Sequence, residues 1–355
     1  MKILVGMSGG IDSSVAAHLL KEQGHQVVGI TMTIWSNRAH LERPEGSRSC
    51  FAPDKREDIA KIQEICASIG IEHQVLELSD RFEEVVLENF KREYLDGRTP
   101  NPCVWCNAAI KFGAMVDYAR ESGIDFDKFA TGHYARIVER NGRLAIARAV
   151  DLRKDQSYFL HRLSQEQLSR TLFPLGSLTK DEVRQIDVRL GFHRPEQTES
   201  QDFYDGDYTD LLEVEDQKGN IVTLDGEILG QHNGIFHYTI GQRKGLGIAS
   251  DRPLYVLQLR PHSNEVVVGY QEETVQTTVT ATDVVWQAVP SLEGEVFAKG
   301  KIRSASRAAD CTVTQEGQRI IARFEGGVNA AALGQSLVIY DGDEILCGGI
   351  IEQTH

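Results

Sequence analysis

The sequence predicts an α/β domain built on a parallel sheet, followed by a small mixed domain and a C-terminal β-barrel. Three observations support this prediction. A strand, a glycine-rich loop and a helix open the chain, strands and helices then alternate, and short β-runs dominate from about residue 275. Such alternation is typical of parallel strands that are connected by helices. We expect domains at 1–203, 204–275 and 276–355.

The composition indicates a globular protein of several domains. The chain has 355 residues, 41% of them hydrophobic, and no apolar run approaches the ~20 residues of a membrane span. A strand follows Met1-Lys2 with no room for a signal peptide, so we expect a cytoplasmic protein with no membrane partner and six reduced cysteines. The net charge of −14 argues against nucleic acid as a partner, but basic residues gather at 136–154 and 299–307.

The expected elements follow from hydrophobic periodicity and from glycine and proline positions. Residues 3–5 predict the first strand, 15–23 a helix that ends at Gly24, and 26–33 a second, parallel strand. The later ranges are helices over 54–69, 80–97 and 110–118, strands over 73–78 and 129–134, a hairpin over 135–148, and a helix from the capping box at 179–182 to Gly191.

The loop from Gly6 to Ser14 has the composition of a phosphate-binding turn. Its glycines let the backbone approach oxyanions, while the amides and the positive end of the following helix face them. The loop lacks the lysine that closes a P-loop and does not have the G-x-G-x-x-G spacing. It offers a polar cradle of serines and glycines, in which Asp12 is placed to orient the loop or to hold a metal ion.

A second signal is the pair Cys103-x-x-Cys106. Pro100 and Pro102 argue against a regular helix between 98 and 107, so we expect these cysteines in a loop. A C-x-x-C pair can be a redox dithiol, half of a metal site, or a nucleophile with a partner. Cys66, Cys311 and Cys347 lie in apolar stretches and are interpreted as structural.

The loop Ser8-Gly9-Gly10-x-Asp12-Ser13 resembles the PP-loop of the Rossmann-like ATP pyrophosphatases, which split ATP between the α and β phosphates. A wider set of motifs resembles the tRNA-specific 2-thiouridylase family, and the match spans the chain in order. These motifs are Met7 to Ser13, Gly97 to Asn107, Ala130 to Tyr134, Lys154 to Tyr158, Tyr238 to Gly247, and Gly334 to Ser336.

The resemblance implies an ATP- and Mg²⁺-dependent enzyme, a tRNA-uridine 2-sulfurtransferase, that replaces O2 of the tRNA wobble uridine with sulfur. Its partners would be tRNA and a sulfur donor, either a cysteine desulfurase, a sulfur carrier or free sulfide. The implied ATP-binding residues are Gly6, Met7, Ser8, Gly9, Gly10, Ile11, Asp12, Ser13, Met32 and Gly132. The implied tRNA contacts are Asn101, Pro102, Cys103, His133, Lys154, Asp155, Gln156, Arg303, Ser304 and Gln335. Cys106 would sit at the nucleophile position of the family, and Cys103 and Asp12 are the further catalytic candidates.

The chain departs from the common family pattern at two positions. Many members have aspartate at the position of Cys103 and a second catalytic cysteine at that of Tyr204. Tyrosine cannot carry a persulfide, so three alternatives stay open. Cys50, Cys103 and Cys106 could hold an Fe–S cluster of the 4Fe–4S type. Cys106 could instead carry a persulfide that Cys103 resolves, or the thiols could belong to a zinc site with a fourth ligand.

Two rival functions remain for this sequence. One is another adenylating PP-loop enzyme, such as an amidotransferase-type synthetase, which would need an ammonia source. The other is a non-catalytic tRNA-binding homologue, suggested by Tyr204.

Overall fold

The computed structural model describes residues 1–35, 49–51, 56–194 and 203–355. The chain divides into two compact units, each discontinuous in sequence, which are described one at a time. The first consists of Met1–Val86, Cys103–Asp207 and Asp343–Ile345, and the second of Leu87–Pro102, Tyr208–Gly342 and Leu346–His355. The three-domain division at 203/204 and 275/276 stays a prediction.

The first unit is built on a parallel five-stranded sheet in the order β3-β2-β1-β4-β7, as the alternation predicted. The strands are β1 (Lys2–Gly6), β2 (Gln26–Thr33), β3 (Glu72–Glu77), β4 (Lys128–Ala130) and β7 (Thr171–Leu172). The central strand β1 is buried through Ile3, Leu4 and Val5. Such a run of buried apolar residues is typical of a central strand that is covered on both faces.

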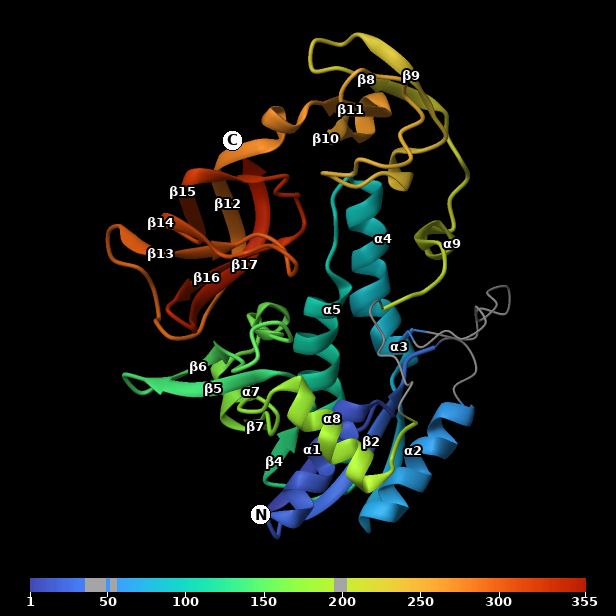
Figure 1. Ribbon diagram of the computed structural model, residues 1–355, viewed down its shortest axis with the longest axis vertical. Coiled ribbons are helices and arrows are strands. Elements are labelled where there is room, and N and C mark those ends of the chain that lie inside the picture. The colour runs from blue at the N-terminus through green and yellow to red at the C-terminus, as the bar shows by residue number, and fades with distance from the viewer. Residues whose placement is uncertain (36–48, 52–55, 195–202) are drawn as a thin grey trace. The chain divides into compact units, whose positions relative to one another are not determined.

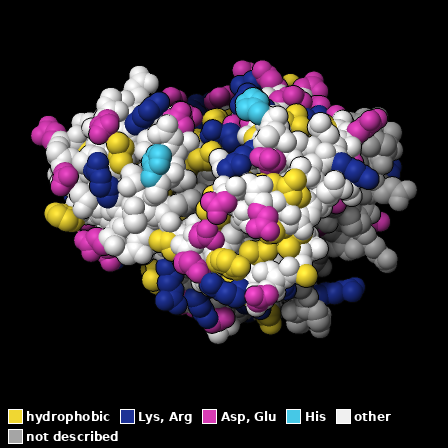
Figure 2. All heavy atoms as spheres, turned by 90° about the horizontal axis from the view of Figure 1, so that it is seen from above, with side chains coloured by type: hydrophobic (Ala, Val, Ile, Leu, Met, Phe, Trp, Pro, Cys, Tyr) yellow, Lys and Arg dark blue, Asp and Glu magenta, His cyan; other side chains and the backbone are white. Residues whose placement is uncertain are grey.

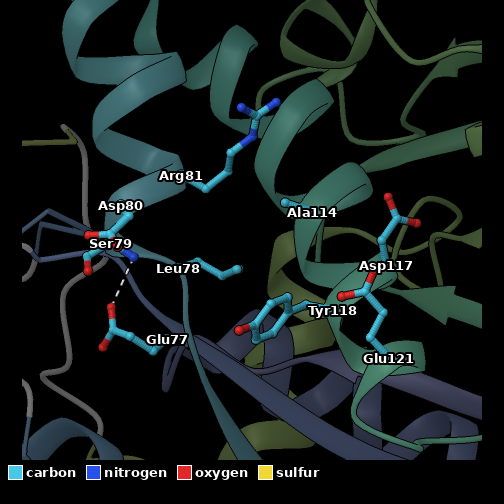
Figure 3. A pocket seen from close by; sticks show the side chains of 9 residues that line it. All are labelled: Glu77, Leu78, Ser79, Asp80, Arg81, Ala114, Asp117, Tyr118 and Glu121. Carbon is cyan, nitrogen blue, oxygen red and sulfur yellow. Dashed lines mark hydrogen bonds between the residues drawn. The ribbon is translucent and has the colours of Figure 1, made fainter.

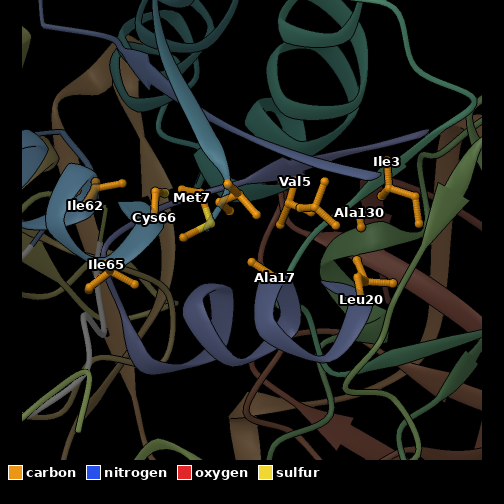
Figure 4. Packing of buried hydrophobic residues seen from close by; sticks show 11 residues of the cluster. Ile3, Val5, Met7, Ala17, Leu20, Ile62, Ile65, Cys66 and Ala130 are labelled. Atoms are coloured by element: carbon orange, nitrogen blue, oxygen red, sulfur yellow. The ribbon is translucent and has the colours of Figure 1, made fainter. Parts of the chain in front are cut away.

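Helices cover this sheet (Figure 1). They are α1 (Ile11–Glu22), α2 (Arg56–Ile69), α3 (Ser79–Phe82), the π-helix η1 (Glu83–Leu87), the 3-10 helix η3 (Ser157–Leu160), α7 (Gln165–Ser169) and α8 (Lys180–Leu190). One core cluster joins Val5 of β1, Ala17 of α1 and Ile62 of α2, and Cys66 is buried within it (Figure 4). The apolar stripe of each helix thus fixes the strand–loop–helix turn at the carboxyl end of β1.

The prediction of a loop over 98–107 is wrong for its second half, which is helical. Helical structure begins at Pro102 and continues through α5 (Pro102–Trp105), the π-helix η2 (Cys106–Ala114) and α6 (Met115–Glu121). A proline is tolerated in the first helical turn, because the amide hydrogen that it lacks would have no helical partner there. Both cysteines of the pair therefore lie on a helix, and Cys103 lies in its first turn.

Two local predictions in this unit are confirmed. Asn141 and Gly142, both with positive φ (51° and 75°), turn the hairpin of β5 (Ala135–Arg140) and β6 (Arg143–Arg148). Thr179 and Glu182 form the capping box of α8, and Gly191 ends that helix in the left-handed conformation. The expected strand over 129–134 is shorter, because β4 ends at Ala130.

The second unit contains α4 (Glu88–Leu95), α9 (Tyr208–Leu212) and two β-structures. A four-stranded sheet has the order β10-β11-β8-β9. Its strands are β8 (Gly219–Val222), β9 (Ile228–His232), β10 (Tyr255–Arg260) and β11 (Glu265–Gly269). Short 3-10 turns lie at η4 (Ile235–His237), η5 (Pro261–Ser263) and η6 (Gln271–Thr274).

The predicted C-terminal β-barrel is confirmed. Six strands follow the order β12-β15-β14-β13-β16-β17, and β12 pairs with β17 to close the barrel. They are β12 (Val275–Trp286), β13 (Val296–Lys301), β14 (Ala309–Glu316), β15 (Arg319–Asn329), β16 (Ser336–Asp341) and β17 (Glu344–Thr354). Closure leaves no unpaired barrel edge. Basic and acidic side chains are mixed on the face of the molecule that Figure 2 shows.

Candidate active site

The phosphate loop is closed by its own serine hydroxyls. The Ser13 hydroxyl donates to the Gly10 carbonyl at 3.0 Å and accepts from the Ser8 amide at 3.2 Å. The Ser14 hydroxyl donates to the same carbonyl at 3.0 Å. No side chain caps the amino end of α1. The positive end of the α1 dipole is therefore presented to the loop, as phosphate binding requires.

Two other predicted nucleotide-binding segments lie beside this loop. A Cβ atom added to Gly132 would lie 2.7 Å from the backbone of Asp12 and Ser13, so only glycine allows this approach. On the other side, the Thr31 hydroxyl donates to the Met7 carbonyl at 2.8 Å, one residue before Met32. The fold thus gathers the loop, the end of β2 and Gly132 at the carboxyl edge of the sheet.

Asp12 is held by two side chains that the sequence did not single out. The Lys180 ammonium donates to Asp12 Oδ1 at 2.7 Å, and the Tyr134 hydroxyl donates to the same atom at 2.9 Å. Lys180 is 4% exposed and Tyr134 1%. Lys180 lies 168 positions after Asp12, so no local motif could have linked the two.

The C-x-x-C pair lies on the same helical stretch as a lysine. Cys103 is half-buried and Cys106 is buried, and no disulfide joins any of the six cysteines. In a π-helix the backbone bonds join residues i and i+5. Lys111 therefore lies on the same side of η2 as Cys106, whereas about 3.6 residues per turn would separate them.

Three thiols influence the pKa of Lys111. Burial alone would lower the pKa of Lys111. Its pKa is nevertheless raised, because thiol groups that can become anionic act on it, those of Cys106, Cys50 and Cys103. All three cysteines proposed as a working set thus contribute to the raised pKa of Lys111.

Cys50 is held by contacts with a segment that is distant in the sequence. Its thiol donates to the Phe203 carbonyl at 3.7 Å, and the Phe51 amide donates to that carbonyl at 2.9 Å. Tyr204, at the position where many family members have cysteine, is 4% exposed and packs edge-on against the ring of Phe51 at 6.3 Å. Tyr204 is thus a core side chain. The neighbouring residues 199–202 lie outside the described residues.

His133 is a neutral imidazole in this site. Its Nδ1 atom lies 2.8 Å from the Thr131 hydroxyl. Burial, and secondly the charge of Lys111, lower the pKa of His133 to about 3. At neutral pH this ring can exchange hydrogen bonds with a base or ribose but does not supply a positive charge to phosphate.

The arrangement does not have the form of a metal centre. Within the described ranges, which include all six cysteines, no group of three or more His, Cys, Asp or Glu side chains is placed to hold a metal ion. A cluster or zinc ion would also have to share the surroundings of Cys50, Cys103 and Cys106 with a lysine cation. As they are arranged, these residues fit a set of thiols near a cation better than a cluster or zinc site.

Several predicted tRNA contacts also stabilise local structure. Asp155 accepts from the Ala149 amide at 3.1 Å and from the Ser157 hydroxyl at 2.8 Å. The Gln156 side chain accepts from the Tyr134 amide at 2.9 Å, and the Lys154 amide donates to a backbone carbonyl at 3.0 Å. These contacts order the turn that follows the hairpin and the chain beside Gly132.

The remaining predicted contacts belong to the second unit. The Gln335 amide group donates to the carbonyls of Thr99 and Pro100 at 3.2 and 3.1 Å, just before the buried Asn101 and the half-buried Pro102. Arg303 and Ser304 are exposed in the turn after β13. Gln335 thus fixes the chain that leads to Asn101, while Arg303 and Ser304 are accessible to a ligand.

A pocket of about 370 Å³ in the first unit lies elsewhere (Figure 3). It is lined by Glu77 to Arg81, Ala114, Asp117, Tyr118 and Glu121. Glu77 accepts a hydrogen bond from the Ser79 amide at 2.9 Å, which Figure 3 draws. Four carboxylates against one arginine repel a polyphosphate, so this pocket does not fit ATP.

Comparison with known proteins gives three family matches along the chain and a consistent set of relatives. A family described as tRNA methyl transferase HUP domain matches residues 1–204, a tRNA methyl transferase PRC-barrel domain matches 211–270, and an aminomethyltransferase beta-barrel domain matches 276–351. The tRNA-specific 2-thiouridylase MnmA of Endomicrobium trichonymphae is 43% identical over 356 residues, with 99% of each chain covered. The protein of that name from Geobacter metallireducens is 44% identical, covering 99% of this chain and 96% of its own.

A solved 4-thiouridine synthetase–RNA complex with bound ATP is also similar, at 16% identity and a TM-score of 0.34, covering 54% of this chain and 41% of that one. A likeness this weak carries no argument about the chain. The described residues contain no helix long and apolar enough to cross a membrane.

Proposed function

Because the chain belongs to the tRNA-specific 2-thiouridylase family, we propose that it is a tRNA-uridine 2-sulfurtransferase acting on the wobble uridine. It is a PP-loop enzyme that thiolates tRNA with ATP. One observation carries the sulfur part of the proposal: Cys103 and Cys106 lie three residues apart on one helical stretch, in the unit that also holds the phosphate loop. A cytoplasmic location is proposed with it, because tRNA and ATP are available there.

The first step activates a poor leaving group. Uridine O2 attacks the α-phosphorus of ATP, pyrophosphate leaves, and N3 of the base loses its proton. The loop amides and the amino end of α1 would hold the phosphates. When bound, Mg²⁺ would offset the charge of the β and γ phosphates. Asp12 is the carboxylate of the loop that would hold the ion.

The second step delivers sulfur. The thiolate of Cys106 takes the outer sulfur from a donor persulfide, and the donor leaves as a thiolate. The terminal sulfur of the Cys106 persulfide attacks C2, and AMP leaves with the original O2. The thiolate of Cys103 then attacks the Cys106 sulfur. The electron pair of the broken S–S bond goes to the uridine sulfur, N3 regains a proton, and 2-thiouridine is released. An external dithiol reduces the Cys103–Cys106 disulfide.

The surroundings of the cysteines support these roles. A cation near a thiol favours the thiolate, which is the nucleophilic form, and Lys111 follows Cys106 by one π-helical turn. Cys103 lies three residues before Cys106 on one helical stretch, a spacing that brings side chains to the same face. Asn101 and Pro102 immediately precede Cys103 and are the proposed contacts to the flipped-out base.

One assay tests the proposal. The full-length protein is incubated with ATP, Mg²⁺, a persulfide donor and unmodified tRNA under anaerobic conditions, and the nucleosides are analysed for 2-thiouridine. We expect product from the wild type and from Cys66→Ala, and none from Cys106→Ser. Cys66 is a suitable control because burial raises the pKa of its thiol to about 11. Failure of the wild type with every sulfur donor would favour a tRNA-binding homologue or another adenylating enzyme.

Iron and sulfide assays on the same anaerobic preparation separate the persulfide route from the cluster. Full activity without iron supports the persulfide route with a desulfurase or carrier as donor. Activity that follows iron content, with free sulfide as donor, would contradict it and favour a cluster on Cys50, Cys103 and Cys106.

A further inference from the structure

Helix α8 contacts the phosphate loop at two separate points. At its first residue, Lys180 donates to Asp12 Oδ1 at 2.7 Å. Three residues after its end, the His193 ring meets the Gly9 carbonyl at 3.1 Å through Nε2 and Asp187 Oδ1 at 2.6 Å through Nδ1. The two contacts lie on opposite ends of the same helix and reach different parts of the same loop.

The helix between these contacts is held as a rigid element. Its amino end has a complete capping box, and its carboxyl end closes at Gly191 with φ of 68°. The buried side chain of Val183 packs against Ile11 and Val15 of α1 in one apolar cluster. Because both ends and the face toward α1 are fixed, the two polar contacts have a defined spacing.

The contact at Gly9 restrains an unusual backbone conformation. Gly9 has φ of 79°, a conformation that side-chain-bearing residues seldom adopt. Both partners of the His193 ring, a carbonyl and a carboxylate, are hydrogen-bond acceptors, so the ring links the Asp187 carboxylate to the Gly9 carbonyl. The side chains of His193 and Asp187 are each only 4% exposed. A buried pair of this kind sets the direction of the Gly9 peptide.

The contact at Asp12 compensates the negative charge of this carboxylate. An aspartate in a loop that receives a triphosphate repels its ligand. The loop has no lysine of its own, and the buried Lys180 supplies the opposite charge from a distant part of the chain. The Tyr134 hydroxyl, on the same oxygen, fixes the carboxylate.

We propose that α8 is an electrostatic brace of the phosphate loop, in which Lys180 neutralises Asp12 and the His193–Asp187 pair orients the Gly9 peptide. These contacts compensate the charge of Asp12 and orient the Gly9 peptide before ATP binds. Lys180, His193 and Asp187 are thus positioning residues for ATP binding. The proposal rests on the ATP use of the family and adds residues that lie outside the loop.

Binding of a non-hydrolysable ATP analogue to the full chain, by calorimetry without tRNA or Mg²⁺, tests the charge part. We expect Lys180→Met to weaken binding on the order of tenfold, because it leaves Asp12 uncompensated. The double variant Asp12→Asn/Lys180→Met should regain most of the lost affinity, and Asp12→Asn alone should bind at least as tightly as the wild type. Lys299→Met, in the barrel, is the control and should bind normally.

A double variant that stays as weak as Lys180→Met, or weaker binding by Asp12→Asn alone, would overturn this part. The Asp12 side chain is partly exposed, so we expect Asp12→Asn to fold. This variant therefore still tests the proposal if Lys180→Met does not fold. Absence of analogue binding to the wild type itself would instead count against ATP use, which separates the two failures.

Hydrogen exchange of the loop amides tests the shaping part. His193→Asn and Asp187→Asn should each accelerate exchange in the peptide that covers 6–14 and weaken analogue binding by roughly threefold to tenfold. His25→Asn, just after α1, is the matched control and should change neither. Unchanged loop exchange in both variants, with a normal melting temperature, would contradict the orienting role.

Discussion

The thiol of Cys50 donates to the carbonyl of Phe203 at 3.7 Å, although the two residues lie 153 positions apart. This contact holds Cys50 next to Tyr204, the position at which many members of the family have their second catalytic cysteine. Cys50 is thus a third candidate thiol besides Cys103 and Cys106, and the role of each can be separated by trapping.

Replacement of the resolving cysteine should trap the enzyme on its substrate. In Cys103→Ser, the bond between the uridine sulfur and Cys106 has no thiol to break it, so a covalent tRNA adduct should accumulate in one turnover. Denaturing gels with labelled tRNA detect this adduct, and a dithiol should release it. Cys50→Ser should turn over without an adduct. The reverse pattern, an adduct only in Cys50→Ser, would give the resolving role to Cys50.

Removal of the lysine charge should make the catalytic thiols less reactive. Lys111→Met removes the cation one π-helical turn after Cys106, so the pH at which Cys106 reaches half-maximal alkylation should rise. Mass spectrometry after timed iodoacetamide treatment measures this pH for each cysteine. Lys111→Arg should retain most of the reactivity, and Lys61→Met, at an exposed position of α2, should not change it. An unshifted profile in Lys111→Met would contradict the role of this lysine.

Local patterns were sufficient to predict much of this fold. The capping box at Thr179 and Glu182 and the turn at Asn141-Gly142 depend on neighbouring residues only, and both are confirmed. The glycine-rich loop was likewise visible, because strand, loop and helix are contiguous in the sequence.

Contacts between residues that are far apart in the sequence could not be predicted from such local patterns. Nothing near Asp12 indicates that Lys180 would neutralise it, since the pairing depends on how α8 packs against α1. The helix at Pro102 was missed because proline is disfavoured within helices but tolerated in their first turn. The π-helical register that aligns Lys111 with Cys106 has no sequence signal that we could use.

A methyl group added at Gly132 should disturb the nucleotide site, because Gly132 lies against the backbone of the phosphate loop. The Cβ atom of Gly132→Ala would lie 2.7 Å from backbone atoms of Asp12 and Ser13, which cannot move without shifting the start of α1. We expect a loss of about 1–3 kcal/mol in the free energy of unfolding and at least tenfold weaker binding of an ATP analogue. Chemical denaturation and calorimetry measure the two effects. Gly326→Ala, where the added atom meets nothing within 4 Å, is the control and should leave analogue binding unchanged. Wild-type analogue affinity in Gly132→Ala would show that the loop tolerates this displacement.

A buried histidine should make the stability of the first unit depend on pH. Burial lowers the pKa of His161 to about 3, against about 6.5 in an unfolded chain. Because the folded pKa is the lower one, the unfolded state binds the extra proton. This contribution to stability is complete above pH ~6.5 and is lost as the pH falls toward 3, by about 1.4 kcal/mol per pH unit. Denaturant unfolding of the wild type at pH 7.5, 6 and 5 should show the decrease. His161→Gln, which cannot titrate but can still donate to the Tyr158 carbonyl, should lose this part of the pH dependence. His262→Gln, at an exposed position, should retain it. Equal pH dependence in His161→Gln and the wild type would mean that His161 takes up its proton in the folded protein as readily as in the unfolded chain.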